Sequence, residues 1–190
     1  MIAPRILIVC TGNICRSPLA EQLLRESLTA AGIDAVVSSA GTSAMTGSAM
    51  TPEAAALSAQ YGASNTDHIA QQLTEKLIAD ADLVLTATRD HRRDVVTLLP
   101  KSTRYTFTLN QFARLVAPDP DAATTTPPPD FPAYVASVAA TRGLQPSPIP
   151  PTLDDVEDPY RQPAAVYARA AAAINASVTT ITAALVAARG

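Results

Sequence analysis

Two cysteines and an arginine lie close together near the start of the chain. Cys10 and Cys15 are the two cysteines among 190 residues, and Arg16 directly follows the second of them in the segment CTGNICRSP, residues 10–18. A cysteine thiolate is a nucleophile, and a planar guanidinium can hold two oxygens of a tetrahedral oxyanion at once. The spacing therefore predicts a site in which Cys10 attacks a bound oxyanion while Arg16 holds its oxygens.

The residues around this segment predict that it forms an anion-binding loop. Residues 5–10 (RILIVC) are a continuous apolar run, as in a parallel strand buried on both faces, and Ser17 followed by Pro18 predicts an N-cap and the first residue of a helix. A loop between a strand and a helix directs backbone N–H groups toward one point, and Gly12 allows backbone angles that other residues resist. The N–H groups and the helix dipole would also favour the thiolate of Cys10. We expect the loop to consist of Cys10, Thr11, Gly12, Asn13, Ile14, Cys15, Arg16 and Ser17.

Strand-like and helix-like segments alternate along most of the chain. After the first strand and helix, strands are predicted at 35–40, 82–87 and 103–107, and helices at 51–62, 74–79, 88–99, 110–117, 133–142 and 163–189, with Val186 on the buried face of the last one. This order predicts an α/β fold: one three-layer domain, residues 1–190, with a central four-stranded parallel sheet and flanking helices. The proline-dense residues 118–152 are expected to form a surface excursion.

Composition excludes several other classes of function. A net charge of −3 and a pI near 5.3 give no general attraction to nucleic acid or to an anionic membrane. The uninterrupted apolar runs are shorter than the ~20 residues of a membrane span, and residues 1–10 lack the features of a secretory signal, so we expect a cytoplasmic protein. Two cysteines with His68 and His91 have no recognised metal-ligand spacing, so no metal site is expected.

The segment CTGNICRSP resembles the signature of the low-molecular-weight protein tyrosine phosphatase family, which is a cysteine, five residues, an arginine and then serine or threonine. Further matches to the family are SSAGT at 38–42, Thr-Asp-His at 66–68, ADLVLTAT at 81–88 and Asp-Pro-Tyr at 158–160, so the resemblance covers most of the chain outside 118–152. It implies an enzyme that hydrolyses phosphotyrosine and other aryl phosphate monoesters through a cysteinyl-phosphate intermediate. The implied substrate is a tyrosine-phosphorylated protein, for example a tyrosine kinase, the product is inorganic phosphate, and no cofactor is needed.

The resemblance also implies roles for individual residues. Asp158 would be the general acid that protonates the leaving group and then the base that activates water. The family's supporting network around the loop corresponds to Asn13, Ser17, Ser39 and His68. The substrate slot would be walled by Met45, where the family often has an aromatic residue, and by Tyr160, after which Arg161 replaces a second aromatic residue.

For the side chains of Cys15 and His91, the sequence gives a less specific prediction. Cys15 is either a small core residue or, as in some family members, the partner of the nucleophile in a reversible disulfide. His91, beside Arg89, Arg92 and Arg93, is expected on a solvated helix face without a role. The acidic residues preceding Asp158, which are Asp154, Asp155 and Glu157, are expected to be nearly silent when neutralised.

Two rival functions stay open at this point. An arsenate reductase on the same fold would need an external thiol, because no cysteine follows Cys15 to relay electrons, and that chemistry gives no reason for Asp158. A non-catalytic phosphotyrosine-binding module would have no need for Cys10, Arg16 and Asp158 together.

Overall fold

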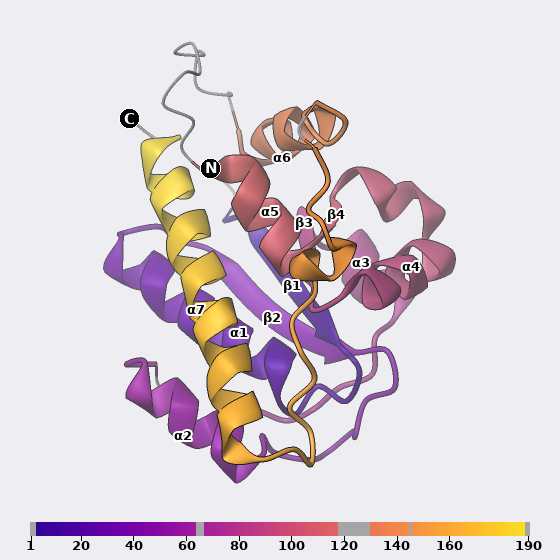
Figure 1. Cartoon of the computed structure of the whole chain (residues 1–190). Helices are drawn as coiled ribbons and strands as arrows, with labels where there is room; N and C mark the ends of the chain where they lie inside the picture. The colour runs from indigo at the N-terminus through magenta and orange to yellow at the C-terminus, as the bar shows by residue number, and fades with distance from the viewer. Residues whose placement is uncertain (1–2, 64–66, 118–129, 145, 189–190) are drawn as a thin grey trace.

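A four-stranded sheet lies at the centre of the molecule (Figure 1). The computed structural model describes residues 3–63, 67–117, 130–144 and 146–188. All strand pairs are parallel, and the strands lie in the order β2-β1-β3-β4. Their bounds are Arg5–Cys10 for β1, Val36–Gly41 for β2, Leu83–Thr86 for β3 and Thr106–Thr108 for β4. The predicted four-stranded parallel sheet is confirmed.

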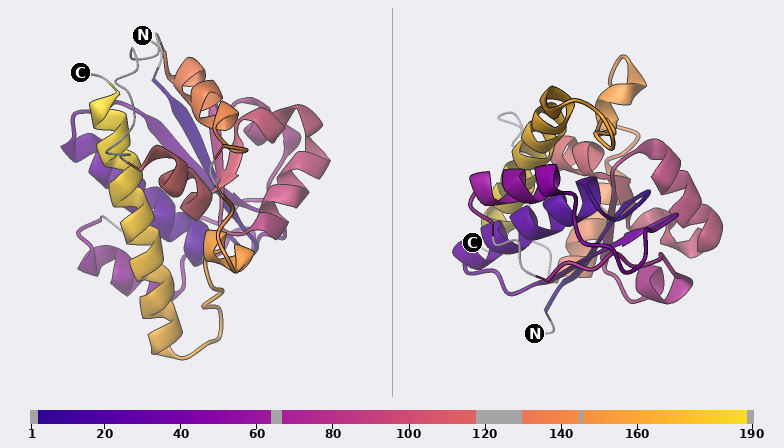
Figure 2. Two further views of the ribbon diagram at one scale, coloured as in Figure 1. Left: turned by 45° about the horizontal axis from the view of Figure 1, so that its top comes forward. Right: turned by 90° about the horizontal axis from the view of Figure 1, so that it is seen from below.

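Helices cover both faces of this sheet, which gives the three predicted layers (Figure 2). Ile6 and Ile8 of β1 pack with α1, α5 and α7 in the larger core cluster, whereas Leu7 and Val9 point to the opposite face, against α3 and α4. The α-helices are α1 (Arg16–Ala30), α2 (Pro52–Gln60), α3 (Glu75–Ala79), α4 (Arg89–Leu98), α5 (Leu109–Val116), α6 (Phe131–Ala140) and α7 (Ala164–Ala187). Two 3₁₀ turns, η1 (Pro100–Arg104) and η2 (Pro151–Asp154), complete the described elements.

Four of the described α-helices have a threonine as their N-cap residue. Thr51, Thr74, Thr88 and Thr108 are N-caps of α2, α3, α4 and α5, and each hydroxyl accepts a hydrogen bond from a backbone N–H in the first helical turn. These caps fix where α4 and α5 start, directly after β3 and β4. Residues 100–104, by contrast, form a 3₁₀ turn, so β4 starts three residues later than the prediction.

The C-terminal helix α7 packs along α1 and α5, which cover one face of the sheet. Ile174, Val178 and Ile181 are at most 1% exposed and lie against α1 and α5. Val186 is 47% exposed, so its predicted burial is wrong, because it lies about 100° around the helix from the buried Leu185. By length and composition alone α7 also qualifies as a membrane-spanning helix, which the test on uninterrupted apolar runs missed; 39% of its apolar window is buried inside the protein.

The proline-rich excursion is partly built into the main core. Residues 118–129 lie outside the described residues, but Val135 and Val138 of α6 are buried in the larger core cluster beside α5. The guanidinium of Arg142 stacks on the buried ring of Phe107 at 3.6 Å from its centroid. From η2 the chain then crosses the front of the molecule toward the start of α7 (Figure 1).

Candidate active site

The strand order changes direction between β1 and β3, which are neighbours in the sheet. The connection from β1 leads to β2 on one side, and β3 leads to β4 on the other, so the order of the strands reverses between them. Open α/β sheets bind ligands at this point. The loop after β1 and the start of α4 after β3 both lie there. The segment 154–158 lies beside them, and its Val156 N–H donates to the carbonyl of Ala87, which follows β3, at 2.8 Å.

The carbonyl groups of the loop after β1 are held by outside partners. The carbonyl oxygens of residues 10–12 accept hydrogen bonds from the backbone N–H groups of Thr42, Ser43 and Met45 at 2.9, 3.0 and 2.9 Å. Within the described residues, no backbone N–H of residues 12–17 donates to a backbone carbonyl. Because the C=O and N–H of a peptide group point in opposite directions, this arrangement leaves the N–H groups for an anion, as the sequence predicted.

The backbone of the loop makes its turn at Asn13. Asn13 has a positive φ of 57°, a conformation that asparagine tolerates better than most residues. Gly12 is outside this region, so the prediction that Gly12 provides the unusual angle is wrong. The glycine that the loop needs is Gly41 at the end of β2, where a Cβ atom would lie 2.3 Å from the carbonyl oxygen of Thr11.

A buried hydrogen-bond network holds Asn13 in this conformation. Its side-chain N–H₂ donates to the hydroxyls of Ser17 at 2.9 Å and Ser39 at 2.8 Å, and its side-chain oxygen accepts from the Gln71 backbone N–H at 2.9 Å. The His68 Nε2 lies 2.7 Å from the Asn13 carbonyl oxygen. The four residues predicted for the network are therefore brought together, and Gln71 joins them.

Glu21 extends this network on the side away from the loop. The Ser39 hydroxyl donates to the Glu21 carboxylate at 2.5 Å, Arg25 pairs with the same carboxylate, and His68 Nδ1 lies 3.9 Å from it. Sequence reasoning missed Glu21. Its position on α1, four residues after Ser17 and so above it on the same helix face, was the available signal.

Ser17 contacts the sulfur of Cys10 and does not cap the helix. α1 begins at Arg16 with Cys15 in the N-cap position and no side-chain cap, so the predicted N-cap is wrong. The Ser17 Oγ lies 2.9 Å from the Cys10 Sγ and accepts the hydrogen bond from Asn13. Since the oxygen already accepts from Asn13, the Ser17 hydroxyl hydrogen is available to the sulfur.

Arg16 lies between the loop and the segment 154–158. Its guanidinium is buried, donates from Nη1 to the Val156 carbonyl at 3.2 Å, and forms an ion pair from Nη2 to the Asp158 carboxylate at 2.9 Å. Nη2 also lies 3.5 Å from the Thr11 hydroxyl. The structure thus brings the predicted Arg16 and Asp158 into direct contact, although they are far apart in the sequence.

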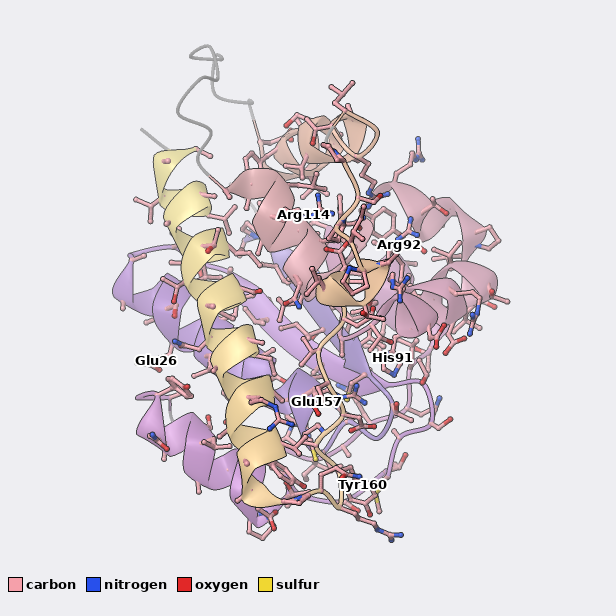
Figure 3. All side chains as sticks on the ribbon, viewed as in Figure 1. Glu26, His91, Arg92, Arg114, Glu157 and Tyr160 are labelled. Atoms are coloured by element: carbon pink, nitrogen blue, oxygen red, sulfur yellow. The ribbon has the colours of Figure 1, made fainter. Side chains whose placement is uncertain are left out.

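Each of the other carboxylates in residues 154–158 is paired with an arginine from a different helix. The pairs are Asp154 with Arg114 of α5, Asp155 with Arg89 of α4, and Glu157 with Arg169 of α7, all at 2.9–3.0 Å. Figure 3 shows Glu157 beside α7 and Arg114 near η2. That these carboxylates are silent stays a prediction; neutralising Asp154 would remove the partner of the half-buried Arg114, and neutralising Asp155 would remove the partner of the exposed Arg89.

His91 is buried at the site rather than solvated, so the prediction of an exposed position is wrong. It is 7% exposed, its Nε2 lies 2.8 Å from the Thr11 hydroxyl, and its Nδ1 lies 2.8 Å from the Thr88 hydroxyl. Burial, followed by the positive charge of Arg16, lowers the pKa of His91 to about 4. The imidazole is therefore neutral at pH 7. Figure 3 shows His91 at the end of α4 that faces the residues 154–158.

Met45 and Tyr160, the two residues predicted to wall the substrate slot, are far apart in the sequence. Met45 is bonded to the loop after β1, and Tyr160 follows the segment 154–158. Met45 is 44% exposed and donates its backbone N–H to the Gly12 carbonyl, so it lies directly against the loop. Tyr160 follows Asp158 by two residues and packs partly on the core, with the Arg161 guanidinium 5.0 Å from its ring centroid. Both predicted slot residues are thus attached to the segments that carry the reacting groups.

Cys15 is a buried thiol next to α7. Its Sγ lies 3.6 Å from the Thr51 hydroxyl and 3.8 Å from the Tyr167 hydroxyl. Burial raises the pKa of Cys15 above its usual value, against the opposite effect of the hydrogen bond with Thr51. In the described ranges of the chain, no group of three His, Cys, Asp or Glu side chains is arranged to hold a metal ion.

Comparison with known proteins agrees with this geometry. A sequence profile of the family described as low molecular weight phosphotyrosine protein phosphatase matches residues 5–125. The chain is 39% identical over 115 residues to the probable low molecular weight protein-tyrosine-phosphatase EpsP of Ralstonia solanacearum, covering 60% of this chain and 77% of that protein. It is 38% identical over 108 residues to a protein-arginine-phosphatase of Bacillus subtilis, covering 56% of this chain and 71% of that protein.

The structural comparison reaches further along the chain than the sequence profile. The structure of the low molecular weight protein tyrosine phosphatase from T. tengcongensis superposes with a TM-score of 0.69 and 29% identity, covering 94% of this chain and 97% of that one. The profile ends before Asp158, so the contact of Asp158 with Arg16 is a separate observation on the same site. The chain belongs to the low molecular weight phosphotyrosine protein phosphatase family.

Proposed function

We propose that this protein is a protein tyrosine phosphatase that hydrolyses aryl phosphate monoesters through a cysteinyl-phosphate intermediate on Cys10. The observation that carries this proposal is the convergence of the Cys10 Sγ, the Arg16 guanidinium and the Asp158 carboxylate at one loop. Membership of the family supports the same chemistry. We further propose that it acts in the cytoplasm on a tyrosine-phosphorylated protein, a tyrosine kinase being one candidate.

The first half-reaction transfers the phosphoryl group to sulfur. The thiolate of Cys10, which contacts the Ser17 hydroxyl, attacks phosphorus, an S–P bond forms, and the P–O bond to the leaving group breaks. Asp158 in its acid form gives its proton to the departing oxygen. Arg16 and the loop N–H groups hold the three equatorial oxygens, where charge must be stabilised during transfer.

The second half-reaction releases phosphate. Asp158, now a carboxylate, takes a proton from water, whose oxygen attacks phosphorus as the S–P bond breaks and the sulfur leaves as thiolate. Inorganic phosphate is the product, and Cys10 and protonated Asp158 return to their starting states. Cys10 is the nucleophile of the first step and water that of the second, while Asp158 serves first as acid and then as base, and Arg16 supplies positive charge in both steps.

The substrate class needs a direct test, because relatives of similar identity bear names with different substrates. Rates should be compared for p-nitrophenyl phosphate, a phosphotyrosine peptide and a phosphoarginine peptide, with rapid-quench trapping of phosphate on Cys10. We expect turnover of both aryl phosphates, with phosphotyrosine preferred over phosphoarginine, and a trapped phosphoenzyme that is absent in Cys10→Ser.

Three outcomes would overturn the proposal. Hydrolysis of phosphoarginine alone would reassign the substrate class. Reduction of arsenate by an added thiol without aryl phosphate turnover would make the protein an arsenate reductase. Binding of the phosphotyrosine peptide with no turnover by the wild-type protein would make it a binding module.

A further inference from the structure

The first turn of α4 contacts both segments of the proposed active site. This helix starts directly after β3, with Thr88 as its N-cap, and Arg89 and His91 belong to its first turn. Arg89 faces the segment 154–158, and His91 faces the loop after β1. These two active-site segments are about 140 residues apart in the sequence, as the hydrogen bond between Arg16 and Val156 records.

Arg89 holds the acid-bearing segment with three donors. Its backbone N–H donates to the Asp155 carboxylate at 2.8 Å, and its side-chain Nε and Nη2 donate to the same carboxylate at 3.2 and 2.9 Å. The Asp155 carboxylate therefore lies at the positive end of the α4 dipole and accepts a bidentate pair of hydrogen bonds from the Arg89 guanidinium. Asp158 follows three residues later and is itself 55% exposed. Asp155 is therefore one of the residues that hold this segment, together with Val156, which is hydrogen-bonded to Ala87 and Arg16.

His91 holds the loop through Thr11. The Thr88 hydroxyl oxygen accepts a hydrogen bond from the His91 backbone N–H at 3.3 Å, and its own hydrogen can then go to His91 Nδ1. This assignment places the imidazole hydrogen on Nε2, which donates to the Thr11 oxygen at 2.8 Å. The same Thr11 oxygen lies 3.5 Å from Arg16 Nη2, so the Thr11 hydroxyl links His91 to the guanidinium that we propose binds phosphate.

We propose that the first turn of α4 sets the distance between the nucleophile loop and the general acid, with Arg89 and His91 as positioning residues for the two sides. The proposal rests on the phosphatase function proposed above. Neither side chain touches the Cys10 sulfur or the Asp158 carboxylate in the structure; each acts through a neighbour, Asp155 or Thr11.

The chemistry explains why such a junction is needed. Asp158 must reach the leaving-group oxygen in the first step and a water molecule in the second, both at fixed positions relative to the loop. A displacement of about 1 Å in such a site can cost on the order of 100-fold in rate. The contacts of α4 with Asp155, together with the hydrogen bond from the Val156 N–H to the Ala87 carbonyl, fix the position of the segment 154–158.

The two positioning roles predict different kinetic signatures. Arg89→Gln should lower kcat about 3- to 30-fold for aryl phosphates with basic leaving groups and change it less than about 2-fold for p-nitrophenyl phosphate, because only the proton-transfer step is displaced. His91→Gln should instead weaken the inhibition by inorganic phosphate or vanadate roughly 3- to 30-fold at an unchanged dependence on leaving-group pKa, because it releases Thr11 and Arg16.

Matched controls keep the test interpretable. Arg93→Gln removes another α4 arginine, whose side chain is 69% exposed and pairs with Asp90 of the same helix, and it should match the wild type. Arg89→Lys should recover part of the lost kcat. Asp155→Asn combined with Arg89→Gln should lose less than the sum of the two single losses, since the two side chains share one ion pair. Circular dichroism melts establish that each variant is folded at the assay temperature.

The results separate the two proposals. If Arg89→Gln lowers the rate equally for all leaving groups, or behaves like Arg93→Gln, the positioning role of Arg89 is wrong; if His91→Gln binds phosphate like the wild type, the role of His91 is wrong. If the wild-type protein turns over no aryl phosphate, the proposed function itself fails, whatever the variants do.

Discussion

Arg16 and Asp158 form an ion pair at 2.9 Å in the absence of substrate. The cation that we propose holds the phosphoryl oxygens is thus paired with the carboxylate that we propose delivers the proton. A phosphate dianion entering the loop competes with this carboxylate for Arg16 and repels its charge. Binding of the anion and uptake of a proton by Asp158 should therefore favour each other, which prepares Asp158 for its role as an acid.

Neutralising Asp158 should separate binding from catalysis. Asp158→Asn is expected to bind inorganic phosphate or vanadate several-fold more tightly, because the amide competes less for Arg16 and carries no negative charge. The same variant should hydrolyse aryl phosphates with basic leaving groups roughly 10²–10⁴-fold more slowly, with a smaller loss for p-nitrophenyl phosphate. Inhibition constants and rates over a series of leaving groups measure both effects. Weaker phosphate binding in Asp158→Asn would contradict the competition.

The planar geometry of Arg16 should matter more than its charge. Arg16→Lys keeps a positive charge but lacks the planar guanidinium, whose Nη1 and Nη2 reach Val156 and Asp158 from fixed positions and could hold two phosphoryl oxygens side by side. We expect kcat/KM for aryl phosphates to fall by at least about 100-fold, in line with the loss of a positioned oxyanion donor. Steady-state kinetics with a phosphotyrosine peptide provide the measurement. A lysine variant with wild-type kcat/KM would show that charge alone is sufficient.

Cys15 should protect Cys10 from irreversible oxidation. Mild peroxide is expected to produce a Cys10–Cys15 disulfide that dithiothreitol reverses, whereas Cys15→Ala should progress to permanent inactivation. The raised pKa of Cys15 keeps it protonated at pH 7, so the disulfide should form faster at higher pH. Mass spectrometry of peptides identifies the linkage. Equal recovery of both proteins, without a linked peptide, would leave Cys15 as a packing residue beside Tyr167.

His91 should make the fold less stable in acid. Its pKa is about 4 in the folded protein and 6.5 in the unfolded chain, so between these values the unfolded chain binds a proton that the folded protein does not. The stability from the neutral imidazole is complete above pH 6.5 and is lost as the pH falls toward 4, by about 3 kcal/mol in total.

The matched comparison is His91→Asn, which has no titrating group at this position. Urea unfolding at pH 7 and pH 4.5 should show that the wild type loses more free energy of unfolding than the variant over this interval. Equal losses would mean that the imidazole is not buried as a neutral group. Protonation of other groups occurs in both proteins and cancels in this comparison. These groups include Asp90, Asp94 and Asp158, whose charges raise the pKa of His91 against the effect of burial.

Local signals account for the parts of the site that the sequence predicted. Cys10 and Arg16 lie within seven residues of each other, between a strand pattern and a helix pattern, so their meeting at one loop needs no long-range information. Asp158 was predicted from the resemblance of its segment to a family motif, and the structure places its carboxylate in contact with Arg16.

The contacts that sequence reasoning missed depend on tertiary packing. His91 lies in a segment rich in arginine and aspartate, which is typical of a solvated helix, and its burial follows from the position of α4 against a loop 80 residues earlier. The helix α1 starts at Arg16 rather than after Ser17, because the Ser17 hydroxyl is committed to the Cys10 sulfur and Asn13. Neither partner set is encoded in the spacing of neighbouring residues.

Gly41 shows how the sheet itself limits the nucleophile loop. The space that a side chain would fill at the end of β2 is occupied by the carbonyl group of Thr11. A Cβ atom on Gly41 would also lie 3.0 Å from the Cα and Cβ atoms of Ala44. The backbone of one strand and the backbone of the loop therefore share one van der Waals surface. A residue with no polar side chain and no access to a substrate thereby determines how deeply the anion-binding loop can settle onto the sheet.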